Sequence, residues 1–442
     1  MPKEAARGSG APLAVWVLTR TALLLCVLKV VTLPGPDVTS DVSVIYQGWH
    51  EVLRTGTFPL DDVTWQYPPA AALAILAPGL VPGLGYATAF FVLVLVCDLL
   101  VLGLLRYAER GGTERRGTWM WVVGVPLLGP TAYARYDLMV TAVAVAALLG
   151  TLPLASPPDS VREAPPGGPP PRPKALGAGR SRPCALGALA GFGALLKVWP
   201  VLLLVGVPRG RAARLAWGTA AATGAGLALA FTAALPGALD FLTYQRDRGT
   251  EVESLGALVF HVARHFGWQG QVLLNYGSVE FVGPHVPLVS GLSLALSVLA
   301  LGWLVVWRLR AREWDPATPC DAAFAAVLLF TVTSRVISPQ YLVWLVGLAA
   351  VCLVRRETRM VRPALLTLAA TAVTVLEFPV WFAHVVASDG LGIALLLLRN
   401  GLLVAATLVA CRRLWRATVP ARQARGVAVS PGARADGSAT AR

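Results

Sequence analysis

"VPLVSGLSLALSVLALGWLVVWRLRAR", residues 286–312, is an apolar run that ends in Arg308, Arg310 and Arg312. Its uncharged part, 286–307, is about as long as the ~20 residues that an α-helix needs to cross a bilayer core of about 30 Å. Arginines concentrate on the cytoplasmic side of membrane helices. The stretch therefore predicts a membrane helix and also its direction.

Comparable apolar runs recur along the chain, at 11–33, 86–105, 117–133, 138–154, 213–235, 318–333, 339–354, 363–384 and 390–411. Apolar residues make up 56% of the chain and charged residues 14%, against about 25% charged in soluble domains. We expect an all-α polytopic membrane protein with about 10–12 membrane segments. Arg20 and Lys29 interrupt the first run and no small-residue cleavage site follows it, so we expect an uncleaved span rather than a signal peptide.

The net charge of +14 comes from arginines in short loops, which is the pattern of cytoplasmic loops and not of a nucleic-acid-binding surface. These groups are Arg106, Arg110, Arg115 and Arg116; Arg209, Arg211 and Arg214; Arg308, Arg310 and Arg312; Arg355, Arg356, Arg359 and Arg362; and the tail from Arg412. No nucleic-acid partner is expected. The six cysteines lie in or beside apolar segments without metal-ligand spacing, which is typical of core residues.

We predict one membrane domain over residues 1–410, followed by a disordered basic cytoplasmic tail at 411–442. Residues 155–183, "ASPPDSVREAPPGGPPPRPKALGAGRSRP", are too rich in Pro and Gly to bury a core, so a flexible loop is expected there. If the basic loops lie on the cytoplasmic side of the membrane, the segments on its outer side are 34–67, 236–285, 334–338 and 385–389. The segment 236–285 is then a long outer loop.

Two segments leave the topology open. Residues 68–82 are short and rich in proline, and residues 184–207 are broken by Lys197 and Pro200. If both cross the membrane, the basic loop 106–116 faces outward, against the charge rule. If both are re-entrant, every basic loop lies inside and "ARYD" at 134–137 lies outside. The charge rule favours the re-entrant arrangement.

"TSDVSVIYQGWHEVLRTG", residues 39–56, has its apolar side chains at helical spacing but is too polar to span a membrane. We expect a helix flat in the outer interface, with Tyr46 and Trp49 directed inward. Thr39 or Ser40 can cap its start and Gly56 its end. Asp41 then lies in the first turn, where it either complements the helix N-terminus or does chemistry. The acids Glu51, Asp61 and Asp62 are expected to be solvated.

Ionisable residues inside membrane segments are costly and are therefore functional candidates. Four occur here: Lys29, Asp98, Lys197 and Glu377. Lys197 is conspicuous because the chain has only 4 Lys among 38 basic residues. It can bind a ligand phosphate, pair with a buried acid such as Asp98, or extend to the interface.

Three further stretches carry polar groups on the expected outer side. "TSRVISPQYLVW", 333–344, places Arg335, Gln340 and Tyr341 between two spans, and an Arg side chain there offers a planar fork for phosphate. "YQRDRGTEVESLGALVFHVARHFG", 244–267, predicts a second amphipathic helix, but His261 and His265 lack a third ligand for a metal. In "ARYD", Arg135 and Asp137 are expected to form a structural ion pair.

Several motifs together resemble a known family. They are "DVSVIYQGWHEVLRTGTFPLDDVTWQYPP", "ARYDLMVTAVAVAALL", "LKVWPVLLL", "RGTEVESL" with "NYGSVEFVGP", and "SPQYLVWL". In this order they resemble the actinobacterial polyprenyl-phosphate-mannose-dependent mannosyltransferases of glycosyltransferase family 87, in the GT-C superfamily. The resemblance extends over roughly residues 13–410.

The resemblance implies a multi-pass enzyme of the plasma membrane with a GT-C-type fold and an outward-facing active site. It implies inverting transfer of mannose from β-linked polyprenyl phosphate to a lipid or glycan hydroxyl, without a metal or other cofactor. The position that matches the general base is Asp41. Arg335, Gln340, Tyr341 and Lys197 become candidates for the donor phosphate, and Tyr67, Arg135, Asp137, Glu253 and His261 for the sugar or acceptor. Many GT-C enzymes carry a close acidic pair, whereas the nearest acid to Asp41 here is Asp37.

Three alternatives remain open from the sequence. The same fold can transfer another sugar, such as arabinose or glucose, because no motif reads the sugar hydroxyls. A transporter or lipid-carrier flippase would use Asp98, Lys197 and Glu377 for ion coupling, although the chain lacks paired halves with matching broken helices. A non-catalytic membrane scaffold would have no need for polar groups gathered on one face.

Overall fold

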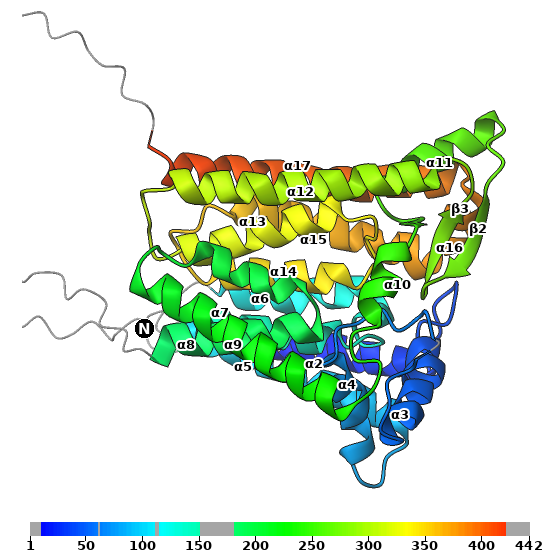
Figure 1. The fold of residues 1–442 in the computed structure, drawn as a ribbon, viewed down its shortest axis with the longest axis horizontal. Helices are drawn as coiled ribbons and strands as arrows, with labels where there is room; N and C mark the ends of the chain where they lie inside the picture. Colours follow the sequence, from blue (N-terminus) through cyan, green and yellow to red (C-terminus); the bar gives the residue numbers. More distant parts are fainter. Residues whose placement is uncertain (1–9, 61, 111–114, 151–180, 421–442) are drawn as a thin grey trace, which may run out of the picture.

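Long helices run side by side along one direction of the molecule, and the connecting segments gather at its two ends (Figure 1). The computed structural model describes residues 10–60, 62–110, 115–150 and 181–420. Among them, five helices are long and apolar enough to cross a membrane, and six shorter apolar helices accompany them. The prediction of an all-α polytopic fold is confirmed.

The first half of the chain contains α2 (Ala11–Val27), the π-helix η1 (Asp41–Tyr46), α3 (Gln47–Arg54), α4 (Ala71–Leu76), η2 (Ala77–Leu80), α5 (Tyr86–Ala108), α6 (Arg116–Gly124), η3 (Pro126–Ala132), α7 (Asp137–Leu149), α8 (Ser181–Leu196), η4 (Trp199–Gly206), α9 (Arg211–Ala234) and α10 (Phe241–Asp247). The segments η2, η3 and η4 are 3₁₀ helices.

The second half contains β1 (Thr250–Glu251), α11 (Ala257–Ala263), η5 (Arg264–Phe266), β2 (Gln271–Asn275), β3 (Ser278–Val282), α12 (Val286–Arg310), α13 (Thr318–Thr333), α14 (Tyr341–Leu353), α15 (Val361–Val375), the π-helix η6 (Leu376–Val380), α16 (Phe382–Ala387) and α17 (Gly390–Thr418). The run 286–312 that predicted a membrane helix corresponds to α12.

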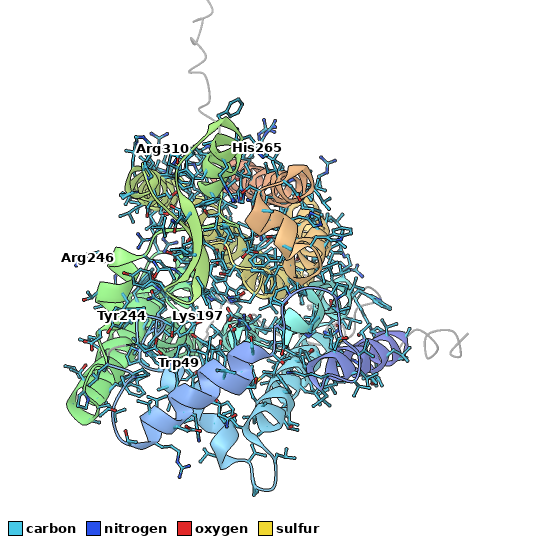
Figure 2. All side chains as sticks on the ribbon, turned by 90° about the vertical axis from the view of Figure 1, so that its right-hand side faces the viewer. Trp49, Lys197, Tyr244, Arg246, His265 and Arg310 are labelled. Atoms are coloured by element: carbon cyan, nitrogen blue, oxygen red, sulfur yellow. The ribbon has the colours of Figure 1, made fainter. Side chains whose placement is uncertain are left out.

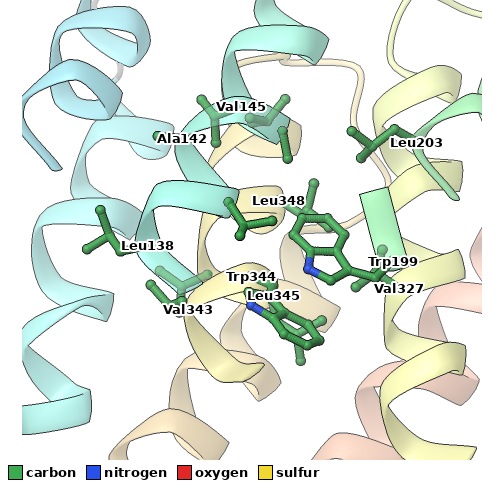
Figure 3. Close-up of a cluster of buried hydrophobic side chains, with 14 of the residues drawn as sticks. Leu138, Ala142, Val145, Trp199, Leu203, Val327, Val343, Trp344, Leu345 and Leu348 are labelled. Atoms are coloured by element: carbon green, nitrogen blue, oxygen red, sulfur yellow. The ribbon is translucent and has the colours of Figure 1, made fainter. Parts of the chain in front are cut away.

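The core lies around α14, whose residues from Leu342 to Leu353 are all buried. Helices α6, α7, α13 and α15 surround it. Figure 3 shows the cluster where Trp199 of η4 meets Trp344 of α14, and the two indole rings stack with centroids 5.3 Å apart. In contrast to α14, helices α9 and α12 are mostly exposed: only 11% and 17% of their most apolar stretches are buried within the protein. Since these two helices are apolar and exposed, they are the ones that face lipid most fully.

The basic loops gather at one end of the bundle, which we call the basic end. Arg209 donates to the carbonyl of Arg308, Arg413 donates to that of Arg359 at 2.9 Å, and the amide of Arg312 donates to Thr418 O at 2.8 Å. The opposite end, called the loop end, carries α3, α4, α10, α11, α16 and the sheet (Figure 1). All of the basic clusters among the described residues therefore share one side, as the charge rule predicts.

The segment 184–207 is re-entrant. The chain turns back after α8 and places η4 against it. A Cβ at Gly193 of α8 would lie only 2.8 Å from the ring of Pro200 in η4. The end of η4 returns to the basic end, where Gly206 contacts the backbone of Pro319. Residues 68–82 form only α4 and η2, which stay at the loop end between α3 and α5 (Figure 1). The structure thus has the arrangement that the charge rule favours.

Close packing of α8 on α9 depends on small residues. A Cβ at Gly187 would lie 2.2 Å from the carbonyl oxygen of Ala216, which cannot move without distorting α9. We expect Gly187→Ala to lower the free energy of unfolding by about 1–3 kcal/mol, as overpacking does. Thermal unfolding of the detergent-purified protein measures this. Gly224→Ala on α9, where a Cβ meets no atom within 4 Å, is the control and should not lower the melting temperature.

Two predicted boundaries are wrong. Helix α8 begins at Ser181, so the last residues of the proposed 155–183 loop are helical. Helix α17 continues to Thr418, so residues 411–418 belong to the domain and not to a disordered tail. The physical reason is packing, because Leu414 is buried and Trp307 donates to the hydroxyl of Thr418 at 2.9 Å. Residues 155–180 of the loop and 421–442 of the tail, with Lys3 and Arg7, lie outside the described residues.

The outer loop 236–285 holds a small antiparallel sheet, in the order β1-β3-β2, which the sequence analysis missed. Strands β2 and β3 form a hairpin because Tyr276 and Gly277 both have positive φ, at 47° and 74°. That backbone suits a two-residue turn between twisted strands. The "NYGS" sequence was the available signal. The amphipathic helix expected near 255–266 is present as α11 and η5.

Candidate active site

A cavity of about 460 Å³ opens at the loop end. Figure 2 views this end directly and places Lys197 near its centre, above Trp49 of α3 and to the right of Tyr244 and Arg246 of α10. Among the described residues, four charged side chains line the cavity: Asp41, Lys197, Arg248 and Arg335. Gln66, Tyr67, Gln245, Ser338, Gln340 and Tyr341 add neutral polar groups.

One limb of the cavity is apolar. It is lined by Leu294, Leu301 and Leu304 of α12 and by Leu329 and Phe330 of α13. Because α12 is a helix that faces lipid, this limb runs beside the expected bilayer. The cavity therefore joins a positively charged compartment to an apolar one, which suits an amphipathic anion.

Asp41 lines the cavity at the first position of the π-helix η1. Wide π-turns of this kind are frequent at functional sites. One carboxylate oxygen pairs with Nη2 of Arg135 at 2.6 Å, and 28% of the Asp41 side chain remains exposed. Arg135 is itself fixed by the carbonyls of Ala134 at 2.8 Å and Val38 at 3.1 Å. The carboxylate is thus oriented and still accessible.

The expected pair between Arg135 and Asp137 is wrong, because Arg135 pairs with Asp41 and Asp137 pairs with Lys197. At the start of α7, Asp137 points to the other side of the chain from Arg135. The expected cap by Thr39 or Ser40 is also wrong: neither side chain caps the helix, and the Thr39 hydroxyl donates to Asp37 at 2.6 Å.

Lys197 lies at the turn between α8 and η4, in contact with five side chains. Its Nζ donates to Oδ1 of Asp137 at 2.7 Å. Four rings surround the ammonium with centroids 5.1–5.4 Å away, those of Tyr67, Tyr136, Tyr341 and Trp344. Aromatic faces stabilise a desolvated cation. Lys197 is therefore a buried, paired cation at the cavity wall and does not extend to an interface.

The proposed cluster at 333–344 does line the cavity through Arg335, Gln340 and Tyr341. The guanidinium of Arg335 also donates to the hydroxyl of Ser290 at 3.1 Å and to the carbonyl of Gln245. These contacts join the start of α12 and the end of α10 to the cavity wall.

Sequence reasoning missed Arg248 as a site residue. It lines the cavity, and its guanidinium is held by Glu280 at 3.0 Å and by Ser278 at 2.6 Å, both on β3. The motif "RGTEVESL" begins at this residue, but the strand that orients its side chain lies about 30 residues away in the chain. Strand β3 of the small sheet thus orients the Arg248 side chain at the cavity.

Tyr67 also lines the cavity, beside Lys197. Burial, with a smaller effect of the Asp137 charge, raises the pKa of Tyr67 to about 12. Its hydroxyl therefore stays protonated at neutral pH and can donate. Three further buried polar atoms of the lining, Tyr46 Oη, Gln66 Oε1 and Trp199 Nε1, have no hydrogen-bond partner within the described protein.

Glu253 and His261 do not line the cavity. Both are buried, with Glu253 beside Arg399 at 3.4 Å and His261 between Ser388 Oγ at 2.7 Å and the carbonyl of Val252 at 2.8 Å. Burial lowers the pKa of His261, so its ring is neutral. Burial, together with the nearby Glu377 and Glu251 carboxylates, raises the pKa of Glu253 well above its usual range. Their partners indicate a structural role.

Two other charged residues, Asp62 and Lys29, have positions that differ from the expectation. Asp62 is not a solvated charge, because it accepts from the indole of Trp49 at 2.7 Å and from the amide of Thr64 at 2.9 Å. Glu51 is exposed, as expected, and Asp61 lies outside the described residues. Lys29 lies beyond the end of α2 and pairs with Asp37 at 2.8 Å, so it is not intramembrane.

Asp98 and Glu377 are buried ion-pair partners. Asp98 pairs with Arg20 at 2.9 Å and accepts from Trp16, Trp121 and Tyr133, while Glu377 pairs with Arg399 at 2.7 Å. The proposed pair between Asp98 and Lys197 is therefore not formed. Within the described residues, no group of three or more His, Cys, Asp or Glu side chains is placed to hold a metal ion.

A family model and several solved structures match this chain. Two solved structures of ArnT from Cupriavidus metallidurans are similar in fold. The form bound to undecaprenyl phosphate has 15% identity and a TM-score of 0.42, covering 92% of this chain and 78% of that one. The apo form has 17% identity and a TM-score of 0.38, covering 91% and 77%. No curated protein matches the sequence significantly. The sequence model of Glycosyltransferase family 87 matches residues 65–339, which is more than half of the 442 residues, and the chain therefore belongs to this family.

Proposed function

We propose that the protein transfers a sugar, mannose by its resemblance, from a polyprenyl-phosphate donor to a hydroxyl of a lipid or glycan acceptor. The observation that carries the proposal is the cavity, which combines one carboxylate, three cations and an apolar limb. A polyprenyl-phosphate sugar has matching parts: a reacting sugar, an anionic phosphate and a long apolar tail. The tail would occupy the limb between α12 and α13.

Asp41 would act as general base. Its carboxylate removes the proton of the acceptor hydroxyl as that oxygen forms a bond to the anomeric carbon of the sugar. The bond from the anomeric carbon to the phosphate oxygen breaks on the opposite face, and polyprenyl phosphate leaves with the electron pair. A β-linked donor then gives an α-linked product. Arg135 supports this role because it holds the carboxylate in one orientation.

Lys197, Arg248 and Arg335 would stabilise the leaving phosphate. Charge accumulates on the phosphate as the bond breaks, and preorganised cations in a water-poor site stabilise such charge most effectively. Each of the three is already fixed by a protein partner: Asp137, Glu280 and Ser290 respectively. Gln340 and Tyr341 would add neutral donors from the same wall.

The lining favours a neutral sugar. Among its described residues the only acid is Asp41, which is needed as the base, so an amino sugar would find no second carboxylate. Tyr46 Oη and Gln66 Oε1 are unpartnered and buried, as expected of groups that bind sugar hydroxyls. Tyr67 lies beside them in the wall. Mannose satisfies these conditions, and so do other neutral hexoses.

The flippase alternative gains no support from the buried charges. Asp98, Glu377 and Lys197 each have an ion-pair partner at 2.9 Å or less. Each of these charges is already compensated by a protein partner, so none of them requires a bound ion. These groups stabilise the bundle in the arrangement described above.

The direct test uses membranes that contain the wild-type protein and labelled polyprenyl-phosphate-mannose, with the lipids of the host as acceptors. We expect label to move from the donor into a new glycoconjugate. Parallel reactions with polyprenyl-phosphate-glucose and polyprenyl-phosphate-arabinose test the sugar. Faster transfer of either would refute mannose, and absence of transfer from all three donors, with solute or lipid translocation instead, would refute the enzyme.

We further propose that the loop end, and with it the active site, faces outward from the plasma membrane. This follows from the basic loops at the other end. In a variant with the native cysteines replaced by Ala, we expect a membrane-impermeant thiol reagent on intact cells to label Glu51→Cys. The exposed basic-end position Arg312→Cys should react only after permeabilisation. The reverse pattern would invert the topology.

A further inference from the structure

Arg399 lies in the middle of α17, fully buried, and its guanidinium joins three separate segments. Nη1 donates to Glu377 of η6 at 2.7 Å and to the carboxylate of Glu253 at 3.4 Å. Nη2 donates to the carbonyls of Glu253 at 2.5 Å and Ile337 at 3.2 Å. Asn400 reinforces the contact by donating to the Glu253 carbonyl at 3.2 Å. One side chain thus binds α17 to the segments 249–256 and 334–340.

The same two segments are also bound to each other. The buried carboxylate of Glu251 accepts from the amide of Ile337 at 2.6 Å and from the hydroxyl of Ser338 at 2.6 Å. The amide of Glu251 donates to the carbonyl of Arg335 at 3.1 Å. Glu251 and Arg399 therefore hold Ile337 from two sides.

Each of these segments adjoins a cation of the cavity. Arg248 comes directly before the first segment, and Arg335 lies in the second, followed by Gln340 in the wall. Arg399, Glu253 and Glu377 do not line the cavity themselves. The buried network stands directly behind the part of the wall that carries positive charge.

We propose that Arg399 is a positioning residue that fixes Arg248 and Arg335 relative to each other for the donor phosphate. The proposal rests on the proposed function. Cations stabilise a leaving phosphate best when supporting contacts hold them at the required separation before the ligand arrives. Without Arg399, the buried Glu253 and Glu377 side chains and the carbonyls of Glu253 and Ile337 would lose the donor that they share, and nothing from α17 would hold the two segments together.

The test compares Arg399→Met with Arg20→Met in the full-length, detergent-purified protein. Arg20 is a matched control because it is also buried and ion-paired, but its partners Asp98, Trp121 and Val122 do not line the cavity. The first readout is affinity for polyprenyl phosphate, which needs no acceptor. The second is amide hydrogen exchange in residues 248–256 and 334–340, which needs no ligand.

For Arg399→Met we expect an affinity loss of about 10-fold or more, as when the supporting partners of a site are removed, and faster exchange in both segments. Arg20→Met should keep the affinity within about twofold, because the cavity wall is unchanged. Arg399→Lys keeps the positive charge but loses the planar guanidinium with its several donors. The affinity of this variant for polyprenyl phosphate should fall between those of wild type and Arg399→Met. If Arg399→Met is poorly folded, Arg399→Met with Glu377→Met removes one uncompensated acid and should show the same loss.

Unchanged exchange in the two segments would overturn the positioning role, whatever happens to affinity. Equal affinity losses in Arg20→Met and Arg399→Met would overturn it as well, since the effect would then be general destabilisation. If the wild-type protein itself fails to bind polyprenyl phosphate, the proposed function fails, and the exchange comparison still decides whether Arg399 holds the two segments.

Discussion

Asp41→Asn is expected to lower the rate of sugar transfer by about 10²–10⁴-fold, the contribution typical of a positioned general base. The amide keeps the shape of the side chain and can still accept from Arg135, so the cavity should remain intact. Affinity for polyprenyl phosphate should therefore not decrease. The measurements are transfer of labelled mannose and binding of the carrier by the same purified variant.

Glu51→Gln is the control for this experiment. Glu51 is an exposed acid on α3, the helix that continues directly from η1. Its loss should leave transfer unchanged, because it does not line the cavity. Transfer by Asp41→Asn at the wild-type rate would show that Asp41 is not the base.

Lys197→Met is expected to remove both stability and activity. It leaves Asp137 buried without its cation, and breaking one side of a buried ion pair costs about 3–5 kcal/mol. It also removes a cation from the cavity wall. The single variant cannot separate these effects, so its low activity alone would not establish a role in phosphate binding.

The double variant Lys197→Met with Asp137→Asn separates them. The amide oxygen of Asn can still accept from the indole of Trp344, which lies 2.7 Å from Asp137 Oδ1 in the wild type. We expect the melting temperature to recover most of its loss while affinity for polyprenyl phosphate and transfer stay low. Recovery of affinity along with stability would show that Lys197 is purely structural.

Several site residues were predictable because each is unusual for its place in the sequence. Asp41 begins a polar helix between apolar runs, and Lys197 interrupts an apolar segment. Arg335 comes between two spans. Such residues oppose the local solvent preference of the chain, so their presence needs a reason. The structure places all three at one cavity.

The ion-pair and hydrogen-bond partners of the charged side chains could not be predicted in the same way. Arg135 and Asp137 are two residues apart, which suggested a pair, yet each binds an acid or base from a different segment. Asp62 looked like a loop charge until its contact with Trp49 was visible. An ion pair forms where two backbones bring charges together, and sequence spacing reports this only within one helix or hairpin.

The sequence by itself determined the membrane fold and the end of the bundle at which the basic loops gather, and from these it predicts the direction of the spans. These properties follow from the length of apolar runs and from where arginines interrupt them, and both act locally along the chain. Only the tertiary structure decided which polar groups share a cavity, that Arg248 belongs to it, and that Arg399 stands behind it. Those facts depend on contacts between segments that are far apart in sequence, such as Glu253 with Arg399 and Arg248 with Glu280, and no local pattern encodes them.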